Sequence, residues 1–225
     1  MISEKQRSAE AACEYVKDGM IVGLGTGSTA EFAVKKIGEL VRNGLSIRGI
    51  PTSDSTKILA EREGIPLIGF SETMFIDLTI DGADEIDANL NMIKGGGAAL
   101  LREKIVASAS REEIIIVSGS KLVQQLGAFP LPVEVIPFGW QVVFNQLESL
   151  QGNPELRLKQ GQPSVTDQGN FIVDCHFRKI ENPEQLEQNL NMIPGVVENG
   201  LFINLCTRMI MADGENIIIK NRNLN

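Results

Sequence analysis

The sequence has few of the residues from which metal centres and disulfide frameworks are built. Its 225 residues include three cysteines, Cys13, Cys175 and Cys206, and one histidine, His176. The cysteines are far apart, their number is odd and they form no C-x-x-C pair, so a disulfide framework is not expected. One histidine with these cysteine spacings does not make a zinc site. We therefore expect free buried thiols, and chemistry carried by carboxylates, lysines and hydroxyls.

Long hydrophobic runs and an excess of positive charge are also absent. No apolar stretch of about 18 residues occurs, so no transmembrane helix is predicted. The N-terminus, MISEKQRSAEAACEYV, lacks a basic and then apolar leader, so we expect a cytoplasmic protein and not a secreted one. The formal net charge of −8 makes nucleic acid and anionic membranes poor partners. An anionic substrate would have to be bound by local lysines and backbone N–H groups.

The first half of the chain alternates helical and strand-like patterns. Helices are predicted over residues 5–17, 31–41, 55–63 and 98–110. Strands are predicted over residues 20–22, 47–50, 66–70, 75–80 and 114–117. This alternation predicts an α/β domain with a mainly parallel sheet.

Near Phe129 the pattern changes to that of a small α+β domain over residues 129–200. The segment PLPVEVIPF holds three prolines, which do not suit a central strand. The elements predicted after it are a helix over 140–150, a hairpin of 163–166 with 171–177, a helix over 183–191 and a strand over 195–202. A last hairpin, 209–211 with 217–219, is expected to return to the first domain, which would comprise residues 1–128 and 201–225.

The first segment that predicts ligand chemistry is 23–29, GLGTGST, at a strand end and a helix start. Glycines allow the backbone to approach a ligand, and a helix N-terminus offers N–H groups that bind phosphate. Thr26, Ser28 and Thr29 add hydroxyl groups. The dinucleotide fingerprint fails at Ser28 and the P-loop lysine is missing, which favours a site for a monophosphate over a nucleotide site. The alternative is a plain tight turn between strand and helix.

The second segment is 77–87, DLTIDGADEID. Asp81, Asp84, Glu85 and Asp87 follow the predicted strand, at the carboxyl end where open α/β sheets bind ligands. Carboxylates gathered at one strand end raise one another's pKa, which indicates metal binding or acid–base chemistry. Because no histidine or further acid has ligand spacing, proton transfer is favoured. An acidic loop that caps a helix is the alternative.

The third segment is 93–105, IKGGGAALLREKI. Three glycines precede a predicted helix and Lys94 stands just ahead of them, so this helix start is a second candidate for binding an anion. On the helix, Glu103 has four apolar neighbours three and four positions away, Ala99, Leu100, Val106 and Ala107. A carboxyl in apolar surroundings has a raised pKa and suits a general base. An equal alternative is that Glu103 lies at the edge of this apolar stripe of the helix and that its carboxyl simply reaches water.

A fourth candidate is Lys121, in the segment SGSK that follows the predicted strand 114–117. A lysine at the carboxyl end of a strand is placed to meet an anionic substrate. An exposed lysine at the start of a helix fits the same pattern, so the residues alone leave both interpretations open.

Taken together, these segments resemble the ribose-5-phosphate isomerase A family. GLGTGST, DGADEID, KGGGAALLREKI, FPLPVEVIP, VTDQGNFIVD and IPGVVENGLF occur in that family's order and spacing. The resemblance implies a Rossmann-like domain with an inserted ferredoxin-like domain, a homodimer or dimer of dimers, and no metal or organic cofactor. It also implies interconversion of D-ribose 5-phosphate and D-ribulose 5-phosphate in the non-oxidative pentose phosphate pathway.

The resemblance assigns roles to particular residues. Glu103 matches the base that moves a proton between C2 and C1 through an enediolate. Asp81 and Asp84 match the pair that handles hydroxyl protons and ring opening, and Lys94 matches the cation beside the developing oxyanion. Matches to substrate-binding positions are Lys5, Thr26, Gly27, Ser28, Thr29, Gly95, Gly96 and Lys121.

Two segments depart from the family's pattern. The family usually has an acid three residues before the lysine that matches Lys121, and this chain has Ser118, so the orientation of Lys121 is not carried over. The family usually has Gly-Ala-Asp where this chain has Cys206, Thr207 and Arg208. An altered edge of the first domain, or an altered assembly, is expected there.

Two other functions were weighed against the isomerase. A non-catalytic sugar-phosphate sensor of similar fold should carry a helix-turn-helix module and a basic face. The chain is acidic, and its α/β domain is predicted to begin near residue 5, so no room is expected for that module. A nicotinamide enzyme is disfavoured by the failed fingerprint. The residues of the four segments together favour the isomerase.

Metal independence is the first testable prediction. Since no His, Cys and carboxylate cluster has ligand spacing, exhaustive EDTA treatment should leave turnover of ribose 5-phosphate unchanged in a coupled assay. Loss of turnover with EDTA, followed by recovery on adding a divalent ion, would show that the reaction uses a metal.

Overall fold

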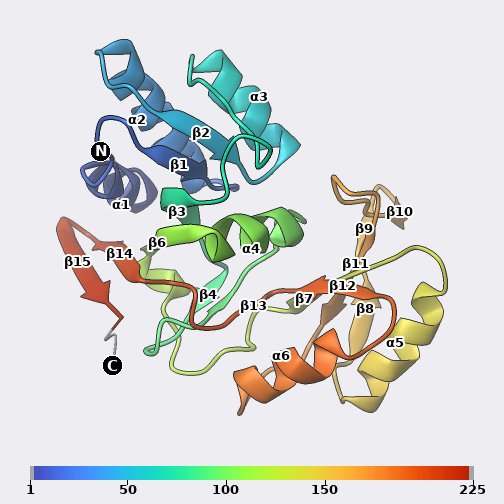
Figure 1. Cartoon of the computed structure of the whole chain (residues 1–225). Helices are drawn as coiled ribbons and strands as arrows, with labels where there is room; N and C mark the ends of the chain where they lie inside the picture. The colour runs from blue at the N-terminus through green and yellow to red at the C-terminus, as the bar shows by residue number, and fades with distance from the viewer. Residues whose placement is uncertain (1–2, 223–225) are drawn as a thin grey trace. The chain divides into compact units, whose positions relative to one another are not determined.

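The computed structural model describes residues 3–222 of the chain, which forms two compact units (Figure 1). The first unit comprises Met1–Ala83, Arg102–Leu122 and Asn204–Asn225, and the second comprises Asp84–Leu101 and Val123–Ile203. The predicted domains have other bounds, because they assign residues 84–101, 123–128 and 201–203 to the first domain. The division into domains at residues 129 and 200 therefore stays a prediction.

The first unit is built on a six-stranded sheet with the order β15-β14-β6-β3-β1-β2. Its strands are β1 (Ile21–Leu24), β2 (Arg48–Pro51), β3 (Ile76–Gly82), β6 (Ser110–Ser118), β14 (Arg208–Asp213) and β15 (Asn216–Asn221). Every pairing is parallel except that of β14 with β15, which form a hairpin. The prediction of an α/β fold with a mainly parallel sheet is confirmed, and so is the return of the last hairpin to this sheet.

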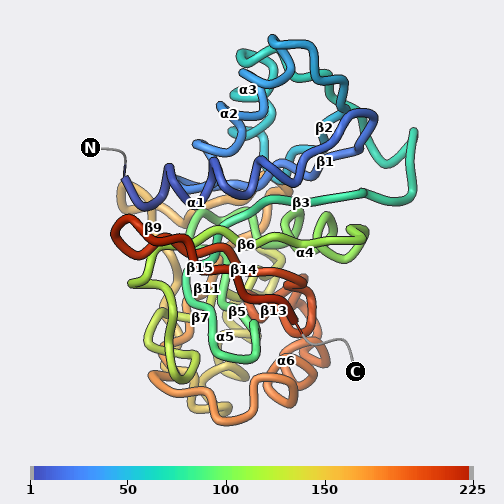
Figure 2. The backbone as a smooth tube through the Cα atoms, turned by 90° about the vertical axis from the view of Figure 1, so that its left-hand side faces the viewer, coloured from blue at the N-terminus to red at the C-terminus, as the bar shows by residue number. Residues whose placement is uncertain are grey.

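Helices cover both faces of this sheet. They are α1 (Glu4–Cys13), α2 (Ala30–Arg42), α3 (Asp54–Arg62) and α4 (Leu100–Ser108). Residues of α1, α2 and α3 share one buried core with Val22 and Leu24 of β1, whereas Val106 of α4 packs with Ile21 on the other face. The helices α2 and α3 lie side by side in both views (Figures 1 and 2). The sheet therefore lies between two layers of helices. In doubly wound folds of this kind, ligands bind at the loops that follow the carboxyl ends of the strands.

The second unit contains a four-stranded antiparallel sheet with the order β12-β7-β11-β8. These strands are β7 (Leu131–Val135), β8 (Pro154–Leu156), β11 (Phe171–Cys175) and β12 (Val196–Asn199). The helices α5 (Trp140–Ser149) and α6 (Pro183–Asn191) contribute Val143, Leu147 and Leu190 to the core that covers one face of this sheet. Shorter strands are β4 (Glu85–Ile86), β5 (Met92–Ile93), β9 (Leu158–Lys159), β10 (Gln162–Pro163) and β13 (Leu201–Phe202).

Three sequence expectations about strands are wrong. The predicted hairpin of 163–166 with 171–177 makes only the bridge from Val165 to Phe171, because β11 pairs with β7 and β8 instead. The proline-rich segment forms β7, an inner strand, because the carbonyl of Pro132 accepts a hydrogen bond from Gly200 N–H (2.7 Å) just beyond the end of β12. In a strand the nitrogen faces the same side as that carbonyl, here toward Gly200, and the Gly200 carbonyl accepts its hydrogen bond from Lys94 N–H (2.9 Å) in place of the missing Pro132 N–H. Residues 66–70 form no strand and make a single bridge, from Leu67 to Gly49, with Phe70 exposed.

The cysteine prediction is confirmed, because Cys13, Cys175 and Cys206 are all free and buried. Burial raises the pKa of each thiol to about 12. The three side chains therefore stay protonated near neutral pH and act as small apolar residues of the core. In the described part of the chain, no helix has the length and apolar character needed to cross a membrane.

Candidate functional site

The loop between β1 and α2 lies against the end of β3. Because β1 and β3 pair in parallel, with Leu24 opposite Ile80, both strands end at the same edge of the sheet. Gly25 follows β1 so closely against β3 that a Cβ atom built on it would lie 2.2 Å from Asp81 Oδ1 and 2.6 Å from Asp81 Cα. Only glycine fits this approach, which explains one of the glycines in the sequence pattern.

Asp81 is fully buried at the carboxyl end of β3, and its carboxylate accepts two backbone hydrogen bonds. Oδ1 accepts from Thr26 N–H (3.0 Å) and from Gly82 N–H (2.7 Å). A buried carboxylate needs such donors, and these two also fix its orientation. The first unit thus holds an oriented carboxylate directly beside the predicted phosphate loop.

The predicted phosphate loop also has a lysine beside it. Lys5 of α1 donates a hydrogen bond from Nζ to Ser28 Oγ (2.8 Å). Thr29 occupies the N-cap position of α2, and its side chain makes no capping hydrogen bond. The start of α2 therefore combines helix N–H groups, two hydroxyls and an ammonium group, which is a suitable set of donors for an anion.

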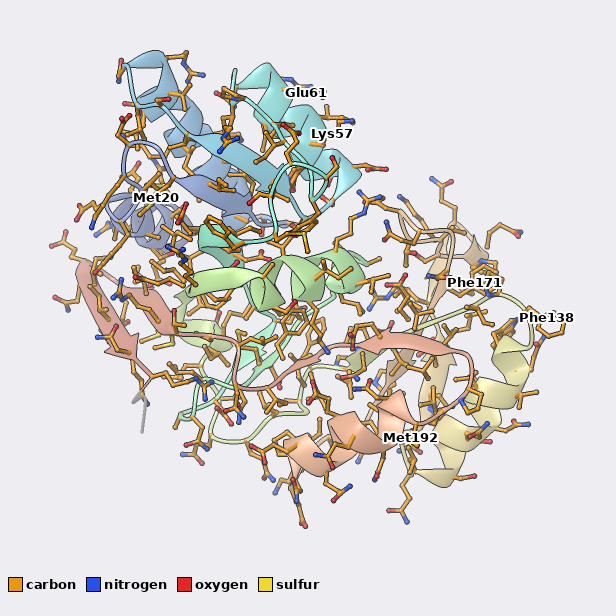
Figure 3. The ribbon with its side chains drawn as sticks, viewed as in Figure 1. Met20, Lys57, Glu61, Phe138, Phe171 and Met192 are labelled. Atoms are coloured by element: carbon orange, nitrogen blue, oxygen red, sulfur yellow. The ribbon has the colours of Figure 1, made fainter. Side chains whose placement is uncertain are left out.

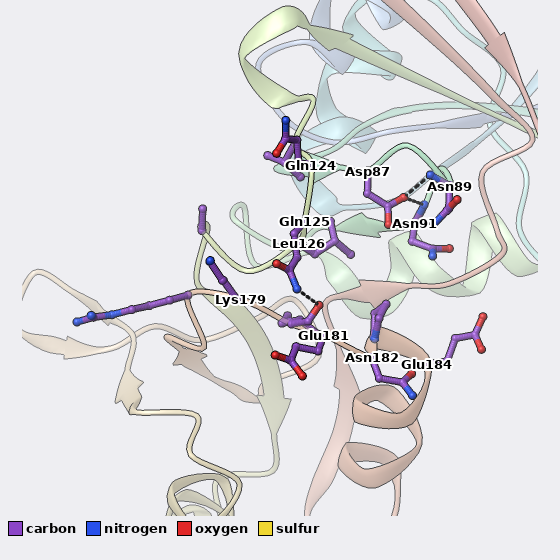
Figure 4. Close-up of a pocket in the computed structure, with 15 residues that line it drawn as sticks. Asp87, Asn89, Asn91, Gln124, Gln125, Leu126, Lys179, Glu181, Asn182 and Glu184 are labelled. Carbon is purple, nitrogen blue, oxygen red and sulfur yellow. Dashed lines mark hydrogen bonds between the residues drawn. The ribbon is translucent and has the colours of Figure 1, made fainter.

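A small cavity of about 260 Å³ adjoins this loop. It is lined by Gly27, Glu31, Lys35, Ser55, Thr56, Ile58, Leu59 and Arg62. A larger cavity, of about 860 Å³, lies in the second unit (Figure 4). Its lining includes Asp87, Asn91, Gln125 and Asn182 but none of the predicted catalytic or substrate-binding residues. Nothing in its lining therefore connects the larger cavity with the predicted chemistry.

Glu103 is buried, with 6% of its surface exposed, in the first turn of α4. The four neighbours predicted from helical spacing are buried as well, Ala99, Leu100, Val106 and Ala107. Arg102 points elsewhere, since its guanidinium pairs with Asp54 at 2.7 Å. The interpretation of Glu103 as a stripe-edge residue that reaches water is therefore wrong.

Lys121 ends the short 3-10 helix Gly119–Lys121, which follows β6 in the first unit. Ser118, where the family usually has an acid, bonds to the exposed Ser120 at 3.1 Å. The other departing segment lies at the start of β14, where Thr207 bonds to the backbone of Glu113 and Arg208 stacks 4.2 Å from the Tyr15 ring centroid. The segment begins an inner strand, because β15 forms the edge of the sheet.

In the second unit, Asp84 holds the glycine-rich loop that was predicted to bind an anion. Its Oδ2 accepts a hydrogen bond from Gly96 N–H at 2.8 Å. Arg157 Nη1 donates to the carbonyls of Gly95 (2.9 Å) and Gly96 (3.2 Å), and its guanidinium also forms a two-point pair with Asp174. The loop conformation is thus fixed from both sides by charged groups.

Lys94 is buried in the second unit, with 2% of its surface exposed. Its Nζ lies 5.4 Å from the centroid of the Phe202 ring, and its backbone N–H donates to Gly200 O at 2.9 Å. A lysine at this depth is an unusual feature, since a buried cation is costly without compensating interactions. A cation–π contact provides part of that compensation.

The acids after β3 are satisfied one by one and do not form a cluster. In the second unit, Glu85 accepts hydrogen bonds from Gly127 N–H and Phe129 N–H, and Asp87 accepts from Asn89 N–H and Asn91 N–H. Within residues 3–222, no group of three or more His, Cys, Asp or Glu side chains is arranged to hold a metal ion. Each of the four acids therefore has backbone N–H partners of its own.

Sequence reasoning missed two sets of residues around these loops. One is Arg157, which stands in a short strand-like segment without a motif. The other is the set of hydroxyls Thr52, Ser53 and Thr56, which contact the Thr26 hydroxyl at 2.7, 2.8 and 3.0 Å. A signal was present in the second case, because PTSDST places four hydroxyl residues at the end of a strand and the start of a helix.

The arrangement within each unit is suited to proton transfer on a phosphorylated substrate. The first unit holds an anion-binding helix start, the oriented carboxylate of Asp81 and the buried carboxyl of Glu103. The second holds the buried Lys94 and the Asp84 carboxylate on a glycine-rich loop. Carboxylates that move protons and a cation that stabilises an oxyanion are the groups that an enediolate reaction requires.

Comparisons with known proteins agree on one family. The family model for ribose 5-phosphate isomerase A (phosphoriboisomerase A) matches residues 48–216. Ribose-5-phosphate isomerase A 1 of Oceanobacillus iheyensis is 50% identical over 217 residues, which cover 96% of this chain and 97% of that protein. The structure of ribose 5-phosphate isomerase from Plasmodium falciparum is 36% identical, with a TM-score of 0.95 over 100% of both chains. A solved D-ribose-5-phosphate isomerase in complex with phospho-erythronic acid is 40% identical, with a TM-score of 0.94 over 97% of this chain and 98% of that one.

The close approach of Gly25 to Asp81 gives the second prediction. Gly25→Ala should lower the free energy of unfolding by about 1–3 kcal/mol, because the new Cβ would overlap the backbone of Asp81. Urea denaturation measures the change. Gly69→Ala is the matched control, since its Cβ would meet only Ser71 Oγ at 3.9 Å. Equal stability of the two variants would show that the two strand ends separate easily.

Proposed function

Because the chain belongs to the ribose 5-phosphate isomerase A family and is an isomerase of ribose 5-phosphate and ribulose 5-phosphate, we propose that Glu103, Asp81, Asp84 and Lys94 carry its chemistry. The reaction moves one proton from C2 to C1, and one hydroxyl proton moves from O2 to O1. Such a reaction needs a carbon base, carboxylates near the hydroxyls and positive charge near the oxygen that becomes negative.

Glu103 is proposed as the base that removes the proton from C2 of the aldose and returns it to C1. The observation that carries this role is its burial in the first turn of α4, among apolar neighbours of the same helix. A carboxylate that is poorly hydrated is a stronger base than one in water. The proton passes from carbon to the Glu103 carboxylate, and the electron pair left behind forms the enediolate.

Asp81 and Asp84 are proposed to handle the hydroxyl protons of the substrate and to assist ring opening. Each carboxylate is held by backbone N–H donors, Asp81 by Thr26 and Gly82 and Asp84 by Gly96. These hydrogen bonds orient the carboxylate oxygens that would accept a proton from a hydroxyl group. Through its hydrogen bond with Gly96 N–H, the Asp84 carboxylate also holds the glycine-rich loop that begins at Gly95.

Lys94 is proposed to stabilise the negative oxygen of the enediolate. Its burial supports this role, because a cation in a poorly hydrated site interacts strongly with an anion that forms beside it. The N–H groups of the Gly95 and Gly96 loop are proposed to bind substrate oxygens next to it. Lys121 is proposed as a second lysine that contacts the substrate.

The phosphate group is proposed to bind at the start of α2, to Gly27, Ser28 and Thr29, with Lys5 beside it. Support comes from the hydrogen bond of Lys5 to Ser28 and from the uncapped N-terminus of the helix. A related isomerase was solved with phospho-erythronic acid, a phosphorylated sugar acid. This chain is proposed to bind the same class of compound, with the carboxylate in the place of the enediolate.

Further features of the enzyme are proposals of the same kind. We propose that it works without a metal or an organic cofactor, in the cytoplasm, as a homodimer or a dimer of dimers. The pentose phosphate pathway is implied by the family. The alternative of a non-catalytic sensor has no support in the comparisons, since the relatives described above are named as isomerases.

The third prediction concerns Glu103. Glu103→Gln keeps the shape of the side chain and removes its basicity, so kcat for ribose 5-phosphate should fall by about 10²–10⁴-fold, the usual contribution of a general base. Exchange of the C2 hydrogen with solvent, followed by NMR in deuterium oxide, should fall in parallel because one group performs both events.

Two controls complete this experiment. Glu61→Gln removes a carboxylate from the exposed side of α3 and should leave kcat unchanged. Binding of phospho-erythronic acid, measured by calorimetry, should persist in Glu103→Gln because the phosphate contacts are on another loop. If Glu103→Gln kept normal turnover while Asp81→Asn lost it, Asp81 would be the carbon base.

A further inference from the structure

Four hydroxyl groups lie together between the phosphate loop and the start of α3, and the exposed Ser55 adds a fifth, whose Oγ is 2.9 Å from Ser53 Oγ. Thr26 Oγ1 lies 2.7 Å from Thr52 Oγ1, 2.8 Å from Ser53 Oγ and 3.0 Å from Thr56 Oγ1. Thr52, Ser53 and Thr56 are each at most 4% exposed. The Thr26 hydroxyl is therefore directed away from the loop surface on which a phosphate would bind.

The protons of this cluster can be assigned because each hydroxyl has one. Thr52 donates to Leu24 O (3.0 Å), and Thr56 donates to Gly25 O (2.9 Å). With those protons committed, Thr52 and Thr56 act only as acceptors toward the other hydroxyls. The one proton of Thr26 goes to Ser53 (2.8 Å), and Ser53 in turn donates to Thr56 (3.0 Å). The bonds that Thr52 and Thr56 donate fix the carbonyls of Leu24 and Gly25, one on each side of Gly25.

The helix α3 supplies this cluster by its capping residue and its inner face. Ser53 is the N-cap of α3, and its Oγ accepts from Thr56 N–H at 3.0 Å. Thr56 and Ala60, four residues apart, are buried, whereas Lys57 and Glu61 lie on the outer side of the helix (Figure 3). The cap and the first turn therefore hold Thr56 in one position beside Gly25.

The backbone that this cluster fixes is the one that binds Asp81. Thr26 N–H donates to Asp81 Oδ1 at 3.0 Å, and this N–H belongs to the peptide whose carbonyl, Gly25 O, accepts from Thr56. The two bonds leave the same planar peptide in opposite directions, because the N–H and C=O of a trans peptide point opposite ways. A rotation of this peptide would break both bonds together.

We propose that Thr56 is a positioning residue of the isomerase, which acts through the Gly25–Thr26 peptide to hold the Asp81 carboxylate in its working orientation. The proposal rests on the role proposed above for Asp81. Thr52 supports the same loop one residue earlier, through Leu24 O. Thr26 contributes its backbone N–H to this arrangement, while its hydroxyl closes the cluster.

The experiment compares two substitutions at one position. Thr56→Val keeps the shape and removes the hydroxyl, and Thr56→Ser keeps the hydroxyl. For Thr56→Val we expect kcat to fall on the order of tenfold, the effect of a buried backbone carbonyl that loses its hydrogen-bond donor, with KM changed by less than about twofold. Thr56→Ser should restore kcat. If both variants lost the same activity, or if KM rose while kcat stayed normal, the proposal would be wrong.

A matched control separates the positioning role of Thr56 from a role in stability alone. Thr166→Val, in the second unit, removes a buried hydroxyl that bonds to Glu134 at 2.9 Å. It should lower the free energy of unfolding but leave kcat and KM unchanged. If Thr56→Val does not fold, Thr52→Val takes its place with the same expected fall in kcat. A normal kcat in the variant that folds would overturn the proposal.

A double-mutant cycle with Asp81→Asn tests the positioning role of Thr56 separately from the proposed role of Asp81. If Thr56 acts through Asp81, then Thr56→Val should add less than about twofold to the loss caused by Asp81→Asn. Additive losses would overturn the positioning role and leave the role of Asp81 intact. Near-normal turnover of Asp81→Asn would instead show that the proposed role of Asp81 is wrong, and the positioning role with it.

Discussion

The hydrogen bond from Thr26 N–H to the Asp81 carboxylate connects the two strand ends on which the first unit's chemistry depends. It is possible because β1 and β3 are parallel neighbours and because Gly25 has no side chain where Asp81 lies. The bond satisfies a buried carboxylate and fixes the peptide from which the phosphate loop begins. The proposed phosphate loop and the carboxylate proposed to handle the hydroxyl protons are therefore joined through one peptide group.

A similar principle organises the second unit. Asp84 accepts from Gly96 N–H, and Arg157 donates to the carbonyls of the same loop while it pairs with Asp174. In both units a carboxylate that is proposed to move protons is also the acceptor that holds a glycine-rich loop. Such groups cannot be substituted without a change in backbone as well as in charge, so their variants need structural controls.

Part of the fold and the site could be predicted from the sequence because those features depend on local patterns. Alternation of helix and strand patterns gives a parallel sheet, and the spacing around Glu103 places its carboxyl on a buried helix face. Proline content misled at β7, since the nitrogen of Pro132 faces a side on which the neighbouring strand has ended. The partners of Glu85 could not be predicted, because they are the N–H groups of Gly127 and Phe129, which are distant in sequence.

The segment PTSDST shows the hydroxyl residues of the cluster, but the groups that they contact could not be predicted, for a related reason. Thr26 and Thr56 are thirty residues apart, and only the packing of α3 beside the β1 loop brings their oxygens together. Serine and threonine near a helix start are usually interpreted as caps, and Ser53 does serve as one. Thr52 and Thr56 bond instead to the Leu24 and Gly25 carbonyls. Tertiary contacts of this kind leave no periodic signal in the chain.

The most direct test of the account is a crystal structure of the protein with phospho-erythronic acid. We predict that the phosphate oxygens accept hydrogen bonds from Ser28, Thr29 and the first N–H groups of α2, while Thr26 Oγ1 stays bonded to Thr52, Ser53 and Thr56 and Thr26 N–H stays bonded to Asp81. A phosphate bound away from the start of α2, or a Thr26 hydroxyl that leaves the cluster to bind the phosphate, would contradict the account.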